Sequence, residues 1–145
     1  MTYQDKTAFV TGAASGIGFA LTEALLSKGA RVMMADVDGP GLAEALAKLG
    51  GASDRLSSTL CDVRSYDAVK AAADLTVETF GSIHIVMNNA GVGLAGRPGR
   101  TDMEDWRWIV DINLMGVVHG VEIFTPLIQS HGEGGHILNL SRIHI

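Results

Sequence analysis

Cysteine and proline are scarce in this sequence, and no block of positive charge occurs. The 145 residues include one cysteine, Cys61, and three prolines. A lone cysteine forms neither an internal disulfide nor a cysteine-based zinc site, so we expect Cys61 to be a small buried side chain. The net charge of −5, without a Lys/Arg block, argues against nucleic acid as a main partner.

Long apolar runs are also lacking. No charge-free run of about 18 apolar residues occurs, and no basic segment followed by an apolar one opens the chain. We therefore expect no membrane span, no secretory signal and a reducing, cytoplasmic environment. Apolar types still make up 47% of the residues, which at this length predicts one folded domain over residues 1–145.

Short apolar runs alternate with amphipathic stretches along the chain. The pattern predicts strands over residues 7–11, 30–36, 55–62, 83–88 and 135–140. It predicts helices over 16–28, 41–49, from a cap at Ser65 to about 80, and from 101 or 102 to about 130 with a break or bend near Pro126. Continuous apolar strands are typical of parallel sheets buried on both faces. The sequence therefore predicts an α/β fold with a doubly wound parallel sheet.

A glycine-rich turn lies between the first strand and the first helix. Gly12 allows a tight turn, while Gly16 and Gly18 remove side chains where a pyrophosphate must approach and where the helix packs on the sheet. With Ser15 and Ile17, they would present the first N–H groups of the helix to phosphate charge. For the glycines alone, a tight turn without a ligand remains the alternative.

An acid at the end of the second strand fits the same site. Asp36 follows Gly18 by 18 residues, close to the spacing of acids that bind an adenosine ribose. Its carboxylate can accept hydrogen bonds from both ribose hydroxyls and would repel a 2′-phosphate. Neither Ser15 nor Val37 offers a cation to offset that repulsion, so the pattern favours NAD over NADP. For Asp36 alone, a helix cap or a solvated acid is the alternative.

These motifs together resemble those of the short-chain dehydrogenase/reductase family over about residues 5–141. The T-G-x-x-x-G-I-G spacing is the family's variant of the glycine motif, and further matches are Asp62-Val63 after the third strand, N-N-A-G at 88–91, D-I-N-L-M-G around Asn113, and GHILNLS at 135–141. The resemblance implies a Rossmann-like fold with strand order 3-2-1-4-5, in which about five of the family's usual seven strands are present.

The resemblance also implies a role for each of these residues. Asp62 and Val63 would lie at the adenine, with the Asp62 carboxylate meeting its amino group, and Asn88 would tie neighbouring structure together. The backbone of Asn89, Ala90 and Gly91 would pass close to the cofactor ribose. The main-chain carbonyl of Asn113 would hold a water in a proton relay. A helix-capping acid remains the alternative for Asp62, and a hydrogen-bonded core amide for Asn113.

The chemistry that the resemblance implies is hydride transfer between nicotinamide and a secondary alcohol or ketone. A tyrosine, with its pKa lowered by a lysine, transfers the proton, and a serine orients the substrate. No Tyr-x-x-x-Lys occurs here, where the only tyrosines are Tyr3 and Tyr66. Arg142 stands at the serine's position, and Ser141 comes one residue early, which on a strand would point it to the other face.

We therefore expect a truncated or altered form of a longer enzyme, which binds the cofactor but lacks the Tyr/Lys pair. The alternative is a non-catalytic dinucleotide-binding module or scaffold. The resemblance implies a small-molecule substrate and a homo-oligomer formed through the long helix after Thr101. The histidines share no metal-ligand spacing, so no metal site is predicted, and His84 is interpreted as a local departure from an acid that many family members carry.

Overall fold

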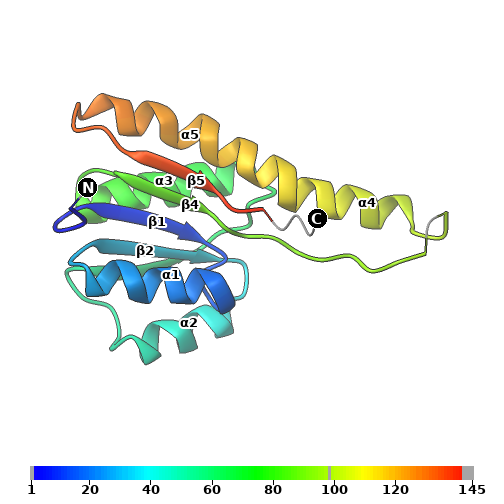
Figure 1. Ribbon diagram of the computed structural model, residues 1–145, viewed down its shortest axis with the longest axis horizontal. Helices are drawn as coiled ribbons and strands as arrows, with labels where there is room; N and C mark the ends of the chain where they lie inside the picture. The colour runs from blue at the N-terminus through cyan, green and yellow to red at the C-terminus, as the bar shows by residue number, and fades with distance from the viewer. Residues whose placement is uncertain (1, 98, 142–145) are drawn as a thin grey trace.

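The computed structural model describes residues 2–97 and 99–141. These residues form one sheet of five parallel strands in the order β3-β2-β1-β4-β5 (Figure 1). The strands are β1 (Thr7–Thr11), β2 (Arg31–Asp36), β3 (Leu56–Leu60), β4 (Ile85–Asn88) and β5 (His136–Asn139). The predicted doubly wound sheet and its strand order are confirmed. Four strands are shorter than predicted: each starts one or two residues later, and β3 and β5 also end earlier.

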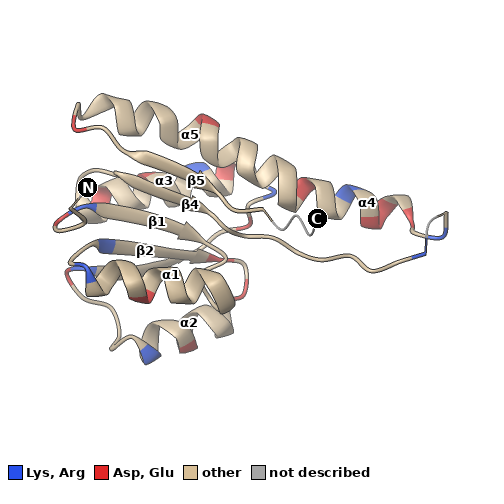
Figure 2. Cartoon of the chain, viewed as in Figure 1, with Lys and Arg blue, Asp and Glu red and all other residues tan. Residues whose placement is uncertain are grey.

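Helices cover both faces of the sheet. Helices α1 (Gly16–Ser27) and α2 (Gly39–Lys48) lie on one face, and α3 (Tyr66–Phe80) and α5 (Gly116–Ser130) on the other (Figure 1). The central strands β1, β2 and β4 are buried on both sides for this reason, whereas the edge strands β3 and β5 are partly or largely exposed. Figure 2 shows the charged residues mainly on the outer helix surfaces and in the turns.

Alternate residues of β1 supply the two halves of the core. Ala8 and Val10 pack with Leu25 of α1 beneath the first pair of helices. Phe9, on the other face, packs against Phe124 of α5, with ring centroids 4.6 Å apart. Burying large side chains on both sides of one strand holds the sheet between its two helix layers.

Helix α2 begins two residues before the predicted start. Asp38 caps it, because the Asp38 carboxylate accepts a hydrogen bond from the N–H of Gly41 at 3.1 Å. Pro40 lies in the first turn, where a missing N–H costs nothing. The prediction excluded this proline from the helix and so missed the cap.

The long helical region is interrupted, but not at the predicted place. Helix α4 (Met103–Val110) passes through a π turn, Asp111–Met115, into α5, and Pro126 lies within α5 without ending it. In the π turn the Gly116 N–H donates to the Asp111 carbonyl, one residue further back than in an α-helix. Helix α4 and the segment before it extend beyond the sheet, and none of the residues of α4 is buried (Figure 1).

By length and apolar composition alone, the stretch Met103–Ser130 would be long enough to cross a membrane. Its C-terminal half instead packs on the sheet, where Ile123, Phe124 and Ile128 are almost completely buried. In the most apolar window of this stretch, 22% of the residues are buried in the structure.

Candidate dinucleotide-binding cleft

The three glycines of the first turn differ in their surroundings. At Gly16, which has a φ of +54°, no atom lies within 4 Å of the place where a Cβ would stand. Gly18 is buried, and a Cβ there would lie 2.1 Å from the Gly12 carbonyl oxygen. Gly18 therefore lets α1 pack against the turn, whereas Gly16 leaves open space at the start of the helix.

The start of α1 has no side-chain cap. Ser15 precedes the helix and its hydroxyl makes no capping hydrogen bond, and no acid lies in the first turn. The first N–H groups of a helix have no partner within it, and the helix dipole places partial positive charge there. This end of α1 is therefore suited to an anion.

The segment after β4 is fastened to the glycine turn. The Thr11 hydroxyl accepts the N–H groups of Asn89 and Ala90, each at 3.0 Å, and donates to the Met87 carbonyl at 3.3 Å. The Asn89 amide donates in turn to the carbonyls of Thr11 at 2.9 Å and Gly12 at 3.3 Å. The sequence predicted an amide tie here but missed the threonine hydroxyl, which uses its full hydrogen-bonding capacity.

Asn88 is buried between strands and helix. Its side-chain amide donates to the Asn139 side chain on β5 at 2.8 Å. A Cβ at Gly120 of α5 would lie 2.2 Å from the Asn88 amide oxygen, so only glycine allows this approach. Asn88 thus ties β4 to β5 beneath α5.

The Asp36 carboxylate is held at the end of β2 by two main-chain groups. One oxygen accepts the N–H of Ala14 in the glycine turn at 2.9 Å, and the other accepts the N–H of Asp38 at 3.0 Å. Each carboxylate oxygen can accept a further hydrogen bond. The acid is therefore oriented beside the glycine turn with acceptor capacity left for a ligand.

Asp62 does not cap α3, because Ser65 does so by accepting the Ala68 N–H at 3.2 Å. The Asp62 carboxylate instead pairs with the Arg64 guanidinium at 2.6 Å, and this hydrogen bond lowers the pKa of Asp62. The preceding Cys61 is buried, as predicted. Burial and the nearby acids raise the pKa of its thiol to about 11, which keeps it neutral near pH 7.

Asn113 lies in the π turn and pairs with Val92. Its amide oxygen accepts the Val92 N–H and its amide nitrogen donates to the Val92 carbonyl, both at 2.9 Å. The side chain is hydrogen-bonded but exposed, so the alternative of a core amide is wrong.

One cleft gathers the predicted residues at the carboxyl ends of the strands. Its volume is about 920 Å³, and every predicted cofactor residue except Gly18 lines it, namely Gly12, Ser15, Gly16, Ile17, Asp36, Asp62, Val63, Asn89, Ala90 and Gly91. Asn113 lines it as well. The strand order turns from β1-β2-β3 to β4-β5 between β1 and β4, and ligands of open α/β sheets bind at such switch points.

Ser141 also lines this cleft. Because β5 ends at Asn139, the alternation of a strand does not extend to Ser141. The predicted mismatch at Arg142 lies outside the described residues.

Several cleft residues were not predicted. Arg64 and Val92 lie on loops at the cleft. An apolar wall comes from the α4–α5 region and is formed by Trp108, Ile109, Ile112, Leu114 and Val117. Ile109 and Val117 lie one helical turn on either side of Asn113, a spacing that could have identified them.

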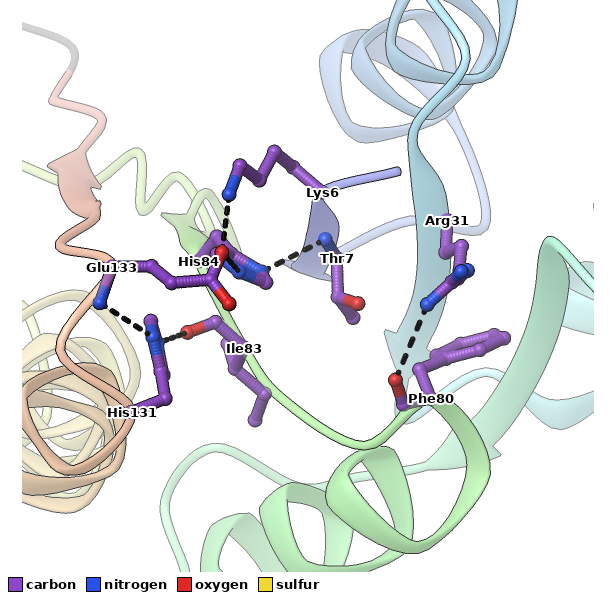
Figure 3. A network of polar contacts seen from close by, with 8 residues as sticks. All are labelled: Lys6, Thr7, Arg31, Phe80, Ile83, His84, His131 and Glu133. Atoms are coloured by element: carbon purple, nitrogen blue, oxygen red, sulfur yellow. Dashed lines mark hydrogen bonds and ion pairs between the residues drawn. The ribbon is translucent and has the colours of Figure 1, made fainter. Parts of the chain in front are cut away.

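A polar cluster lies away from the cleft, at the opposite end of the strands (Figure 3). The Thr7 N–H donates to Nδ1 of His84 at 3.2 Å, so Nε2 carries the ring proton and donates to Glu133 at 3.1 Å. Lys6 pairs with the same Glu133 oxygen. The cluster joins the starts of β1 and β4 to the turn before β5.

His131 completes this cluster, and the hydrogen bonds of the two imidazoles occupy the nitrogen lone pairs that would bind a metal ion. His131 donates from Nε2 to the Ile83 carbonyl at 2.9 Å, and its Nδ1 accepts the Glu133 N–H at 3.2 Å. The ligand atoms of His84, His131 and Glu133 lie within 4.8 Å of one another. However, the unprotonated nitrogen of each imidazole already accepts a main-chain N–H, and metal ligation needs that lone pair.

Sequence comparisons identify relatives along nearly the whole chain. A family model described as short chain dehydrogenase matches residues 6–144. The putative oxidoreductase SadH of Mycobacterium tuberculosis is 37% identical over 142 residues, covering 98% of this chain and 51% of that protein. The 1-deoxy-11-beta-hydroxypentalenate dehydrogenase of Streptomyces avermitilis is 38% identical, covering 95% of this chain and 52% of that protein. The chain spans about half the length of these curated relatives.

Solved structures share the fold. A short chain dehydrogenase/reductase from Burkholderia phymatum, in complex with NAD, matches with a TM-score of 0.91 and 38% identity, covering 94% of this chain and 49% of that chain. A putative short-chain dehydrogenase from Novosphingobium aromaticivorans matches with a TM-score of 0.87 and 37% identity, covering 93% of this chain and 51% of that chain.

Proposed function

Because this chain belongs to the short-chain dehydrogenase family, we propose that it is the NAD-binding part of an oxidoreductase that transfers hydride between nicotinamide and a secondary alcohol or ketone. The cleft at the β1/β4 switch point carries this proposal. It brings the glycine turn, Asp36 and Asn113 to one surface, although they are far apart in the sequence.

The cleft fits a dinucleotide in two respects. Gly16 leaves open space at the uncapped start of α1, which suits a pyrophosphate. Asp36 keeps acceptor capacity beside the same turn, which suits the two ribose hydroxyls. We propose NAD rather than NADP, because a 2′-phosphate would bring its charge against the Asp36 carboxylate.

Nicotinamide supplies the hydride chemistry when the cofactor is bound. In our proposal, Asp62 accepts a hydrogen bond from the adenine amino group, and the backbone at 89–91 passes close to a cofactor ribose. Asn113 lies in the π turn and lines the cleft, and in our proposal its main-chain carbonyl holds a water for proton relay. Ser141 lines the same cleft as Asn113. The variant Ser141→Ala tests whether the Ser141 hydroxyl contributes to ligand binding.

The second candidate is a non-catalytic dinucleotide-binding module. It is favoured by the absence of a Tyr-x-x-x-Lys from these residues. Both candidates require cofactor binding, and they differ in whether these residues also catalyse hydride transfer. We propose that the chain as given binds NAD and does not turn over an alcohol by itself.

We further propose an oligomeric state, a substrate class and a cellular location for the protein. Exposed apolar side chains on the α4–α5 region outside the cleft, among them Trp106, Val110 and Val118, support a homo-oligomer through this surface. A small-molecule substrate and a cytoplasmic location complete the proposal.

Equilibrium binding of NADH tests the first step. Trp108 lines the cleft, so bound NADH should quench its emission and gain sensitised fluorescence. A saturable signal is expected with NADH, together with no NAD reduction in the presence of secondary alcohols. Lack of binding would contradict both candidates, and turnover by the pure chain would contradict the non-catalytic reading.

A further inference from the structure

The Asp62 carboxylate at the edge of the cleft is held by a single residue, Arg64. The Arg64 Nε lies 3.0 Å from each carboxylate oxygen, and its Nη2 lies 2.6 Å from Oδ2. The main-chain N–H of Arg64 also donates to Oδ1 at 3.0 Å. Both side chains line the cleft.

These contacts leave acceptor capacity on the carboxylate. A carboxylate offers about four acceptor positions, two on each oxygen. Three N–H groups reach it: the Nε–H is shared between the two oxygens, Nη2 donates to Oδ2, and the main-chain N–H donates to Oδ1. Three donors on four positions leave capacity for one further N–H donor.

The backbone next to Asp62 is fixed from the other side by α5. The His119 ring donates from Nδ1 to the Val63 carbonyl at 2.8 Å. A Cβ at Gly116 would lie 2.8 Å from the Val63 side chain, so the helix contacts this segment closely. Contacts within the protein therefore hold both the side chain of Asp62 and the backbone beside it without a ligand.

We propose that Arg64 is a positioning residue for the base of the cofactor: its guanidinium holds the Asp62 carboxylate so that the remaining acceptor capacity meets an exocyclic amino group of the base. This inference rests on the proposed dinucleotide binding and extends it to the choice of base. Arg64 acts through Asp62, because preorganising an acceptor removes the rotamer freedom that binding would otherwise have to overcome.

The base itself provides the test. Nicotinamide hypoxanthine dinucleotide differs from NAD in carrying a carbonyl oxygen where adenine carries its amino group, so it offers Asp62 no donor at that position. We would titrate the chain with the reduced forms of both dinucleotides. The comparison includes Arg64→Ala, Arg64→Lys, Asp62→Asn and the double variant of Arg64→Ala with Asp62→Asn.

Arg64→Ala should weaken NADH binding by about two- to five-fold, the range expected for a partly exposed ion pair, and leave the hypoxanthine dinucleotide nearly unchanged. Arg64→Lys keeps the charge but not the fork, so it should recover only part of the preference for adenine. In the Asp62→Asn background, Arg64→Ala should have no further effect. The control Lys70→Ala removes one positive charge from an exposed ion pair on α3 and should alter neither affinity.

Other results would overturn the inference in distinguishable ways. An equal loss for both dinucleotides would mean that Arg64 attracts the phosphates and does not act through Asp62. Unchanged NADH affinity in Arg64→Ala would mean that Asp62 needs no positioning. If the unsubstituted chain bound neither dinucleotide, the proposed function itself would be wrong.

Discussion

Asn113 and Val92 are joined by two hydrogen bonds of 2.9 Å, one in each direction between the Asn113 side-chain amide and the Val92 main chain. This arrangement imitates the pairing of one strand with another. It links the π turn to the segment after β4, which otherwise extends away from the sheet toward α4 (Figure 1).

Replacing Asn113 by alanine should release this segment. Without its acceptor, the Val92 N–H should exchange with deuterium faster, and the loss of two hydrogen bonds at an exposed site should cost about 1–2 kcal/mol of unfolding free energy. Hydrogen exchange and thermal unfolding measure the two effects. Glu122→Ala, exposed on α5, is the control. Unchanged exchange at Val92 would show that the pairing does not hold the loop.

Alanine at Gly16 and at Gly18 should have different effects. At Gly18 the new Cβ would meet the Gly12 carbonyl at 2.1 Å, so Gly18→Ala should lower the melting temperature strongly. At Gly16 the new Cβ meets no protein atom but would enter the space proposed for the pyrophosphate. Gly16→Ala should cost about 1 kcal/mol in backbone strain and abolish most NADH binding.

Gly50→Ala is a matched control for this pair. Gly50 has a φ of +96° with no atom within 4 Å of its Cβ position, and it lies outside the cleft. It should therefore reproduce the strain of Gly16→Ala while NADH still binds. Normal NADH binding by Gly16→Ala would contradict the phosphate role of this turn.

Asp36 should decide the choice between the two nicotinamide cofactors. Asp36→Ala removes both the proposed ribose acceptor and the repulsion of a 2′-phosphate, so NADH should bind about ten-fold more weakly while NADPH changes less. Asp38→Ser, which alters the adjacent acid but keeps a helix cap, should leave both affinities nearly unchanged. Fluorescence titrations measure these affinities. Tighter NADPH than NADH binding by the unsubstituted chain would reverse the cofactor assignment.

The stability of the fold should fall as the solution becomes mildly acidic. Burial lowers the pKa of His84, although Glu133 acts in the opposite direction, and protonated Nδ1 could no longer accept the Thr7 N–H. An unfolded histidine titrates near about pH 6.5. The neutral ring therefore stabilises the fold above that pH, and this contribution is lost as pH falls from there through the lower pKa of the folded state.

Thermal unfolding between about pH 7.5 and 5.5 checks this sign. His84→Asn keeps an acceptor near the Thr7 N–H but does not titrate, so its melting temperature should depend less on pH. His136→Asn, at an exposed position, is the control. Hydrogen bonds from Lys6 and His84 lower the pKa of Glu133 to about 2, so its own contribution is lost only below about pH 4.5. An equally steep pH dependence in His84→Asn would exclude His84 as the source.

The sequence was most informative where the signal is local. Apolar runs located the strands, and Ser65 marked the start of α3, because a cap acts within one helical turn. The π turn was missed, since Asp111–Met115 has no composition that separates it from an α-helix. The contact of His84 with Glu133 was missed because 49 residues separate them. Arg64 was missed because an exposed arginine beside an acid is common on any surface.

The contacts of α5 with Val63 have a consequence for the whole cleft. Gly116 and His119 contact the segment beside Asp62, and Asn113 stands less than one turn before Gly116 on the same helical rod. In the proposed binding mode, one helical rod would therefore set the distance between the base beside Asp62 and the part of the cofactor beside Asn113. A bulkier residue at Gly116 would press on Val63 and alter that distance, although Gly116 itself does not line the cleft.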